Sequence, residues 1–193
     1  MVQSSKRGSI DVKKLSYLAI LTAMVIVLQS VGIFTGMATG LSVNLSLVPI
    51  VIGAALCGKW EGAWLGFVSG AVVLLDPSTV GFMQYSLILT IILCLLKGAM
   101  SGFVAGCVYK LFEKKSKTVG TLVAGILAPI TNTAIFILGC MTIFFDYVKT
   151  GTVGETFIGL LGIFIMTNFI IEMVSSMVLS PAIVRILNAK GKI

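Results

Sequence analysis

Three long apolar runs of this chain each contain a residue that is normally solvated by water. These residues are Lys97, Asn132 and Asn168, and Glu172 follows Asn168 by four residues. Polar groups of this kind are costly inside a membrane and usually serve a function. Counted from the expected ends of the runs, the first three lie roughly 16–20 Å from an interface at 1.5 Å per residue. Glu172 shares the helix face of Asn168, one turn deeper.

This polar cluster permits two interpretations, which can both hold in part. In a structural cluster, Lys97 pairs with Glu172 and the asparagines join helices through hydrogen bonds. In a ligand pocket, Lys97 meets an anionic group and Asn132 and Asn168 bind amides or hydroxyls. We favour the pocket, because hydrophobic packing would hold the helices without such costly groups. Asn44, in an expected outer loop, completes the predicted substrate-binding residues.

The composition indicates that these residues lie in a membrane protein. Of 193 residues, 58% are apolar and 11% are charged, whereas soluble domains carry about 25% charged residues. The mean hydropathy is +1.10. Because one span needs about 20 residues, the chain has room for about six. We therefore predict an all-α integral membrane protein with a six-helix membrane domain over residues 15–188, between cytoplasmic tails at 1–14 and 189–193.

The spans can be placed from the apolar runs and the turn residues. The first run is longer than the apolar core of a signal peptide, so we expect it to be retained. Loops at 35–44 and 76–83 are expected on the outer side, as lids or as plain connectors. The expected spans are 15–34, 45–57, 62–75, 84–112, 119–145 and 157–187.

Basic residues predict the orientation of these spans. Of the 14 lysines and arginines, all but Lys97 and Lys149 fall in the tails or in the loops on the same side. By the positive-inside rule that side is cytoplasmic. The net charge of +7 is thus mainly a topology signal, and we expect no nucleic-acid partner.

Several kinds of chemistry are not expected from this sequence. The four cysteines lie in apolar segments without a CxxC pair, and there is no histidine, which argues against a metal or haem site. The run GAALCGK at 53–59 resembles a phosphate-binding loop, but Trp60 replaces the Ser or Thr that would bind magnesium. We therefore predict no enzyme activity, no ATPase site, no cofactor and no metal.

Small residues recur at four-residue spacing in three spans. This spacing places them on one helix face, where another backbone can approach closely. We interpret two glycine stripes mainly as packing inside the bundle and an alanine pair mainly as a docking face for a partner. The stripes are Gly62, Gly66, Gly70 and Gly98, Gly102, Gly106, and the pair is Ala19 and Ala23.

In their order along the chain, these features resemble the substrate-binding S component of energy-coupling factor (ECF) vitamin transporters. After the basic N-terminus, the resemblance is carried by LSYLAILTAMVIVL, SVNLSLVPIVIGAALCGKWEGAWLGFVSG, LLKGAMSGFVAGCVYKLF, PITNTAIFILG and TNFIIEMVSSMVLSPAIVRIL. It covers about residues 13–188. It implies a six-helix protein of the bacterial plasma membrane with cytoplasmic termini. The vitamin pocket would lie near the outer side, built by helices 4 to 6 and the outer loops. Ala19 and Ala23 would dock onto a transmembrane coupling subunit that carries two ATPase subunits.

The resemblance also bears on the substrate. VNLSLVPIVIGA resembles riboflavin and pantothenate members alike, whereas KGAMSGFVAG, PITNTAIF and NFIIEMV resemble pantothenate-type members more closely. Pantothenate has a carboxylate, an amide and two hydroxyls, which suit Lys97, Asn132 and Asn168. Riboflavin would call for aromatic stacking, yet both tryptophans lie at the cytoplasmic end. We predict pantothenate, with riboflavin, another vitamin or an ion-coupled secondary transporter as alternatives.

Overall fold

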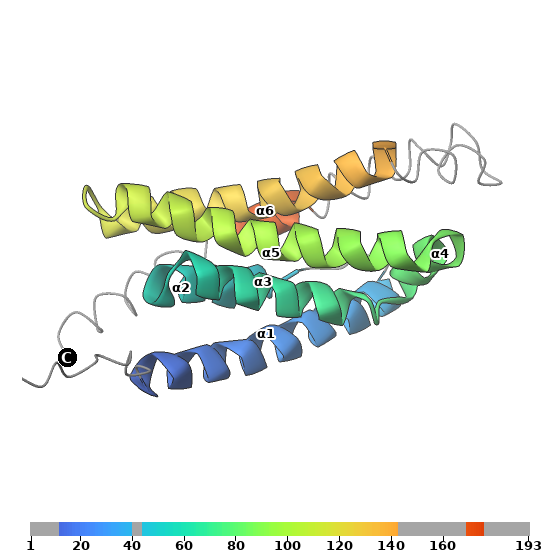
Figure 1. The fold of residues 1–193 in the computed structure, drawn as a ribbon, viewed down its shortest axis with the longest axis horizontal. Coiled ribbons are helices and arrows are strands. Elements are labelled where there is room, and N and C mark those ends of the chain that lie inside the picture. The colour runs from blue at the N-terminus through green and yellow to red at the C-terminus, as the bar shows by residue number, and fades with distance from the viewer. Residues whose placement is uncertain (1–11, 40–43, 143–168, 176–193) are drawn as a thin grey trace, which may run out of the picture.

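The computed structural model describes residues 12–39, 44–142 and 169–175, and these form helices without a strand. Figure 1 shows the longer helices running roughly parallel or antiparallel to one another. The elements are α1 (Val12–Thr39), α2 (Leu47–Cys57), α3 (Lys59–Val73), α4 (Pro77–Tyr85), α5 (Leu87–Phe112) and α6 (Lys117–Thr142), followed by a short helical segment at 169–175. The all-helical prediction is confirmed for these residues.

Among the described residues, three helices are long and apolar enough to cross a membrane, namely α1, α5 and α6. The α3–α4 pair, bent by 84°, would make a fourth if it is one broken span. With 11 residues, α2 measures about 16 Å, well short of the bilayer core. Six spans are therefore not confirmed, and most of the expected sixth span lies outside the described residues.

Two expected loops are partly helical, which corrects the predicted boundaries. Helix α1 continues through Thr39 into the expected 35–44 loop. Helix α4 occupies most of the expected 76–83 loop, because Asp76 caps it by accepting a hydrogen bond from the Ser78 backbone N–H at 2.9 Å. Pro77 follows at the first helical position, where its missing N–H does no harm. This Asp-Pro pair is a helix start rather than a simple turn.

The glycine stripes join α3 to α5, which lie side by side in Figure 1. A Cβ atom added to Gly66 would stand 2.0 Å from the Gly98 carbonyl oxygen, and one added to Gly98 would stand 2.2 Å from the Gly66 oxygen. Gly62 and Gly102 face each other in the same way. The two backbones are therefore in direct contact, and the packing interpretation of these stripes is confirmed.

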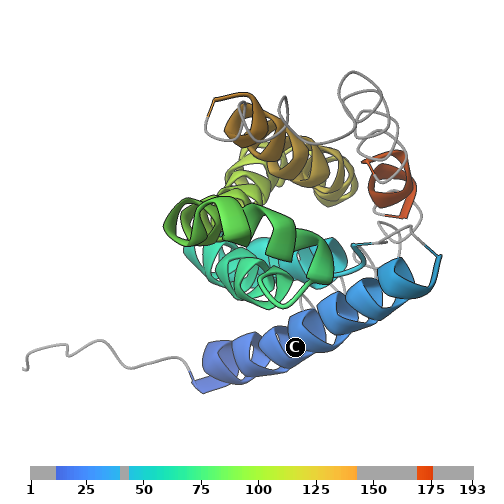
Figure 2. The same cartoon turned by 90° about the vertical axis from the view of Figure 1, so that its right-hand side faces the viewer.

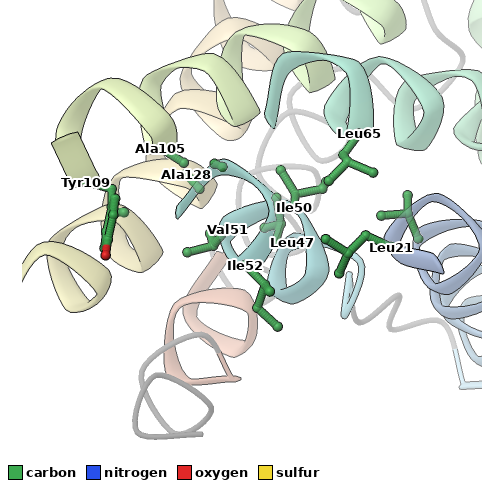
Figure 3. Packing of buried hydrophobic residues seen from close by; sticks show 12 residues of the cluster. Leu21, Leu47, Ile50, Val51, Ile52, Leu65, Ala105, Tyr109 and Ala128 are labelled. Carbon is green, nitrogen blue, oxygen red and sulfur yellow. The ribbon is translucent and has the colours of Figure 1, made fainter. Parts of the chain in front are cut away.

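The apolar core surrounds α2, as the close view in Figure 3 shows. Its side chains Leu47, Ile50 and Val51 are almost fully buried, and α2 contacts α1, α3, α5 and α6. Gly58, with φ of 123°, makes the reversal into α3 that a residue with a side chain would rarely adopt. The short helix thus fills the middle of the bundle over its eleven residues.

Charge is distributed unequally between the two ends of the described bundle. At the end formed by the α2–α3 and α5–α6 connections, Lys14 of α1 pairs with Glu61 of α3. That end also holds Lys13, Lys59, Lys110, Lys114, Lys115 and Lys117. At the opposite end, Asp76 is the charged residue among those described. This asymmetry agrees with the expected orientation, in which the basic end is cytoplasmic.

The α3–α5 contact predicts a strong effect of one added methyl group. Gly66→Ala should lower stability by about 1–3 kcal/mol, because the methyl group meets a backbone oxygen that cannot turn away. The measurement is thermal unfolding of the purified protein in detergent. Ala71→Leu, on the exposed face of α3, is the control and should shift the midpoint little. Equal midpoints for both variants would contradict the contact.

Candidate functional site

Lys97 lies in α5, one residue before the glycine that contacts α3. Its side chain is half-buried, and its ammonium stands 4.8 Å from the centroid of the Phe136 ring of α6. Phe136 in turn meets Phe82 of α4 edge-on, with centroids 5.9 Å apart and ring planes at 73°. The face of an aromatic ring attracts a cation. Helices α4 and α6 thus provide an aromatic surface for the Lys97 ammonium.

Asn132 lies on the same side of α6 as Phe136, because residues four apart share a helix face. Its side chain is half-buried. Within residues 12–39, 44–142 and 169–175, the Asn132 amide makes no hydrogen bond. A polar amide therefore lies about one turn from the Lys97–Phe136 contact. Asn168, the other predicted asparagine, lies outside the described residues.

Glu172 is the acidic residue of the site. Its side chain is only 8% exposed. One carboxylate oxygen, Oε2, is fully buried and has no hydrogen-bond partner among the described residues. The Asn44 side chain and the Lys97 ammonium both lie close enough to act on the Glu172 carboxylate. In Figure 2 its segment lies between α6 and α1.

Lys97 and Glu172 do not form an ion pair. Among the described residues, the one ion pair joins Lys14 to Glu61 at the basic end. The two buried charges are thus close enough to attract each other but lack a direct contact. The structural cluster that the sequence permitted, with Lys97 bonded to Glu172, is not formed in this way.

Asn44 belongs to a buried polar network that sequence reasoning missed. The Ser46 hydroxyl lies 2.6 Å from Asn44 Oδ1, 2.7 Å from Gln29 Oε1 and 2.9 Å from the Ser69 hydroxyl. The Ser69 hydroxyl also lies 2.9 Å from Gln29 Oε1. Gln29, Ser46 and Ser69 are each at most 6% exposed. The network joins α1 and α3 to the residues that precede α2.

Beside Asn44, which the sequence analysis singled out, one member of this network left a signal in the sequence. Gln29 follows the buried Leu21 and Val25 at four-residue steps, so it continues an inward-facing stripe as a polar residue. Ser69 gave none, because helical serines commonly bond to their own helix, as Ser16 and Ser30 of α1 do. Ser46 gave none, because a serine just before a helix is an ordinary N-cap residue.

The alanine pair on α1 faces away from the core. Ala19 and Ala23 are both exposed, whereas Leu21 and Val25 between and beside them are buried. No residue in the described ranges covers this small-residue face. Such a face allows another helix to approach closely.

Comparison with known families identifies the family to which this chain belongs. The family model of the ECF transporter substrate-specific component matches residues 13–184, so the chain belongs to that family. No curated protein and no solved structure matches it. The protein is therefore a substrate-binding transport subunit and not an enzyme. With its apolar helices, it is a multi-pass plasma-membrane protein.

Family membership confirms the resemblance to S components of ECF transporters, but it does not identify the vitamin. It implies a vitamin-type substrate and association with an ECF coupling module. The closeness to pantothenate members is not confirmed.

The buried network predicts a loss of stability on removal of a single hydroxyl. Ser46→Ala should cost about 1–3 kcal/mol, because Asn44 Oδ1 would lose its donor while Ser69 can still donate to Gln29 Oε1. Detergent-solubilised protein would be compared by thermal unfolding. Ser30→Ala is the matched control, since that hydroxyl is exposed and bonds only to the Ile26 carbonyl oxygen. An equal loss of stability in Ser30→Ala and Ser46→Ala would contradict a particular contribution of the network to stability.

Proposed function

We propose that this S component captures a vitamin that bears a carboxylate, pantothenate in the first place, and delivers it through the ATP-driven coupling module. The observation that carries the proposal is the half-buried Lys97 ammonium, which has no carboxylate in direct contact within the described residues. A lysine at the centre of a bilayer costs about 2.5–3.5 kcal/mol. A substrate carboxylate would offset that cost and receive a charge-assisted hydrogen bond.

The surroundings of Lys97 suit the remainder of such a molecule. The free amide of Asn132 can bind an amide or hydroxyl of the substrate, and Asn44, Asn168 and Glu172 supply further polar groups. The Phe82–Phe136 pair offers apolar surface beside them. Pantothenate combines a carboxylate, an amide, two hydroxyls and methyl groups, so each kind of group has a counterpart.

One observation favours a second candidate, riboflavin. The Phe82 and Phe136 rings meet edge-on beside Lys97, and aromatic side chains favour stacking with flat rings. Both tryptophans lie at the cytoplasmic end, so this phenylalanine pair supplies the aromatic surface that the sequence analysis did not expect at the site. Riboflavin therefore stays the main competitor for the site.

Transport requires a partner, since the family works through a coupling module. We place the contact with the transmembrane coupling subunit on the exposed Ala19–Ala23 face of α1. Two ATPase subunits bound to that subunit would supply the energy. The basic cytoplasmic end of the bundle would face them.

The carboxylate proposal is tested with purified protein and two ligands. Wild-type protein should bind pantothenate at least about tenfold more tightly than pantothenol, in which the carboxylate is replaced by an alcohol. Lys97→Met should abolish that preference, whereas Lys110→Met at the cytoplasmic end should retain it. Isothermal titration calorimetry measures both affinities. Unchanged pantothenate binding by Lys97→Met, or much tighter binding of riboflavin by wild-type protein, would defeat the choice of vitamin.

The docking proposal predicts a loss of transport without a loss of binding. Ala19→Leu combined with Ala23→Leu should abolish co-purification with the coupling module and vitamin uptake, because larger side chains keep the partner helix away. Vitamin affinity of the isolated subunit should stay within about twofold of wild type, because both residues are exposed. Ala71→Leu, on another exposed face, is the control. Normal uptake by the double variant would place the docking surface elsewhere.

A further inference from the structure

The free carboxylate oxygen of Glu172 has no role in the fold as described. Buried polar atoms are almost always hydrogen-bonded, so an exception calls for an explanation. Glu172 Oε2 is fully buried without a partner in the described residues. The Asn44 side chain also lies beside this carboxylate, and because Oε2 has no partner, we infer that Asn44 acts on the other oxygen, Oε1. One oxygen is thus held, and the other is available.

The orientation of Asn44 follows from the polar network behind it. Asn44 Oδ1 lies 2.6 Å from the Ser46 hydroxyl, which leaves the amide NH₂ to donate to Glu172. If Ser46 donates to Asn44, Ser69 can donate to Gln29 Oε1 at 2.9 Å. Two hydroxyl hydrogens then satisfy both amide oxygens. The network therefore holds Asn44, and through it Glu172, against α1 and α3.

In its ionised form the carboxylate only accepts hydrogen bonds, so the free oxygen then calls for a donor. The donor should be neutral, since Lys97 already places a positive charge close to Glu172 and a second cation would be repelled. A substrate hydroxyl meets both conditions.

We propose that the site has two poles: Lys97 binds the anionic group of the substrate, and Glu172 Oε2 accepts a hydrogen bond from a substrate hydroxyl. Gln29, Ser46 and Ser69 are positioning residues that act on Glu172 through Asn44. The inference rests on the proposed function and adds to it a substrate class, namely a hydroxylated carboxylic acid. Specificity then depends on both ends of the molecule.

The test compares pantothenate with N-(3,3-dimethylbutanoyl)-β-alanine, which lacks both hydroxyls and retains the carboxylate and amide. Calorimetry on wild-type protein should show at least about tenfold tighter binding of pantothenate. Glu172→Gln should lose most of that preference, whereas Lys97→Met should retain it while losing the preference over pantothenol. A Glu172→Gln variant with the wild-type hydroxyl preference would overturn the proposal.

The positioning residues are tested with the same pair of ligands. Ser46→Ala should weaken the hydroxyl preference several-fold and leave the preference for pantothenate over pantothenol intact. Ser46→Thr, which retains a hydroxyl, should restore the hydroxyl preference. A purely structural role would instead weaken all ligands equally, and that result would remove these residues from the proposal.

Failure of the vitamin choice can be told apart from failure of this inference. If wild-type protein binds riboflavin and not pantothenate, the comparison moves to riboflavin and lumiflavin, which lacks the ribityl hydroxyls. In that case, loss of the preference for riboflavin over lumiflavin in Glu172→Gln would support the binding of a substrate hydroxyl by Glu172, although pantothenate is the wrong vitamin. An unchanged preference would overturn the role of Glu172.

A ligand-free measurement tests the same residue without any choice of vitamin. Glu172→Gln should leave the thermal midpoint of the empty protein unchanged or raise it, because a neutral amide replaces a buried carboxylate whose Oε2 lacks a partner. A midpoint several degrees lower would make Glu172 a structural residue and overturn the proposal.

Discussion

Direct backbone contact between α3 and α5 is the constraint on which the rest of the structure depends. Lipid tails are as apolar as leucine side chains, so helices in a bilayer gain little from burying apolar surface against each other. Glycines allow the two backbones to touch instead, with Gly66 against Gly98 at its centre. This contact sets the depth of Lys97, one residue from Gly98, relative to Ser69, three residues from Gly66. The charged pole and the polar network therefore lie at a similar level because the helices are joined there.

A second consequence follows from the short helix α2. It packs among α1, α3, α5 and α6 but begins only at Leu47, so Asn44 enters the interior ahead of the helix, and Ser46 stands at its N-cap. Non-helical backbone is tolerated at membrane depth only where protein surrounds it. The hydroxyls and amides of the buried network provide that environment. The irregular chain before α2 can thus present Asn44 to Glu172.

The site that results keeps two opposite charges near each other without joining them. A direct Lys97–Glu172 bond would satisfy both groups and leave neither for a ligand. Instead, the Lys97 ammonium lies over the Phe136 ring, and the Glu172 carboxylate lies beside the Asn44 side chain. The protein thereby retains costly polar groups that a substrate can satisfy. This agrees with membership in a family whose subunits bind the substrate and rely on a separate module for energy.

Local features of the sequence were sufficient for the class of protein, the helical content and the glycine packing, and they made Lys97 the centre of the proposed site. Each of these depends on residues close together in the chain: an apolar run, a four-residue repeat or one charge in an apolar segment. The boundary of α4 was also encoded locally, in Asp76 and Pro77, but was interpreted as a turn. Tertiary structure alone decided the rest. Gln29, Ser46 and Ser69 are 17 to 40 residues apart, and hydropathy cannot show which distant hydroxyl meets which amide. Nor could it show that α2 is a short helix buried in the middle of the bundle, or that Lys97 and Glu172 remain apart, because both depend on how the helices pack.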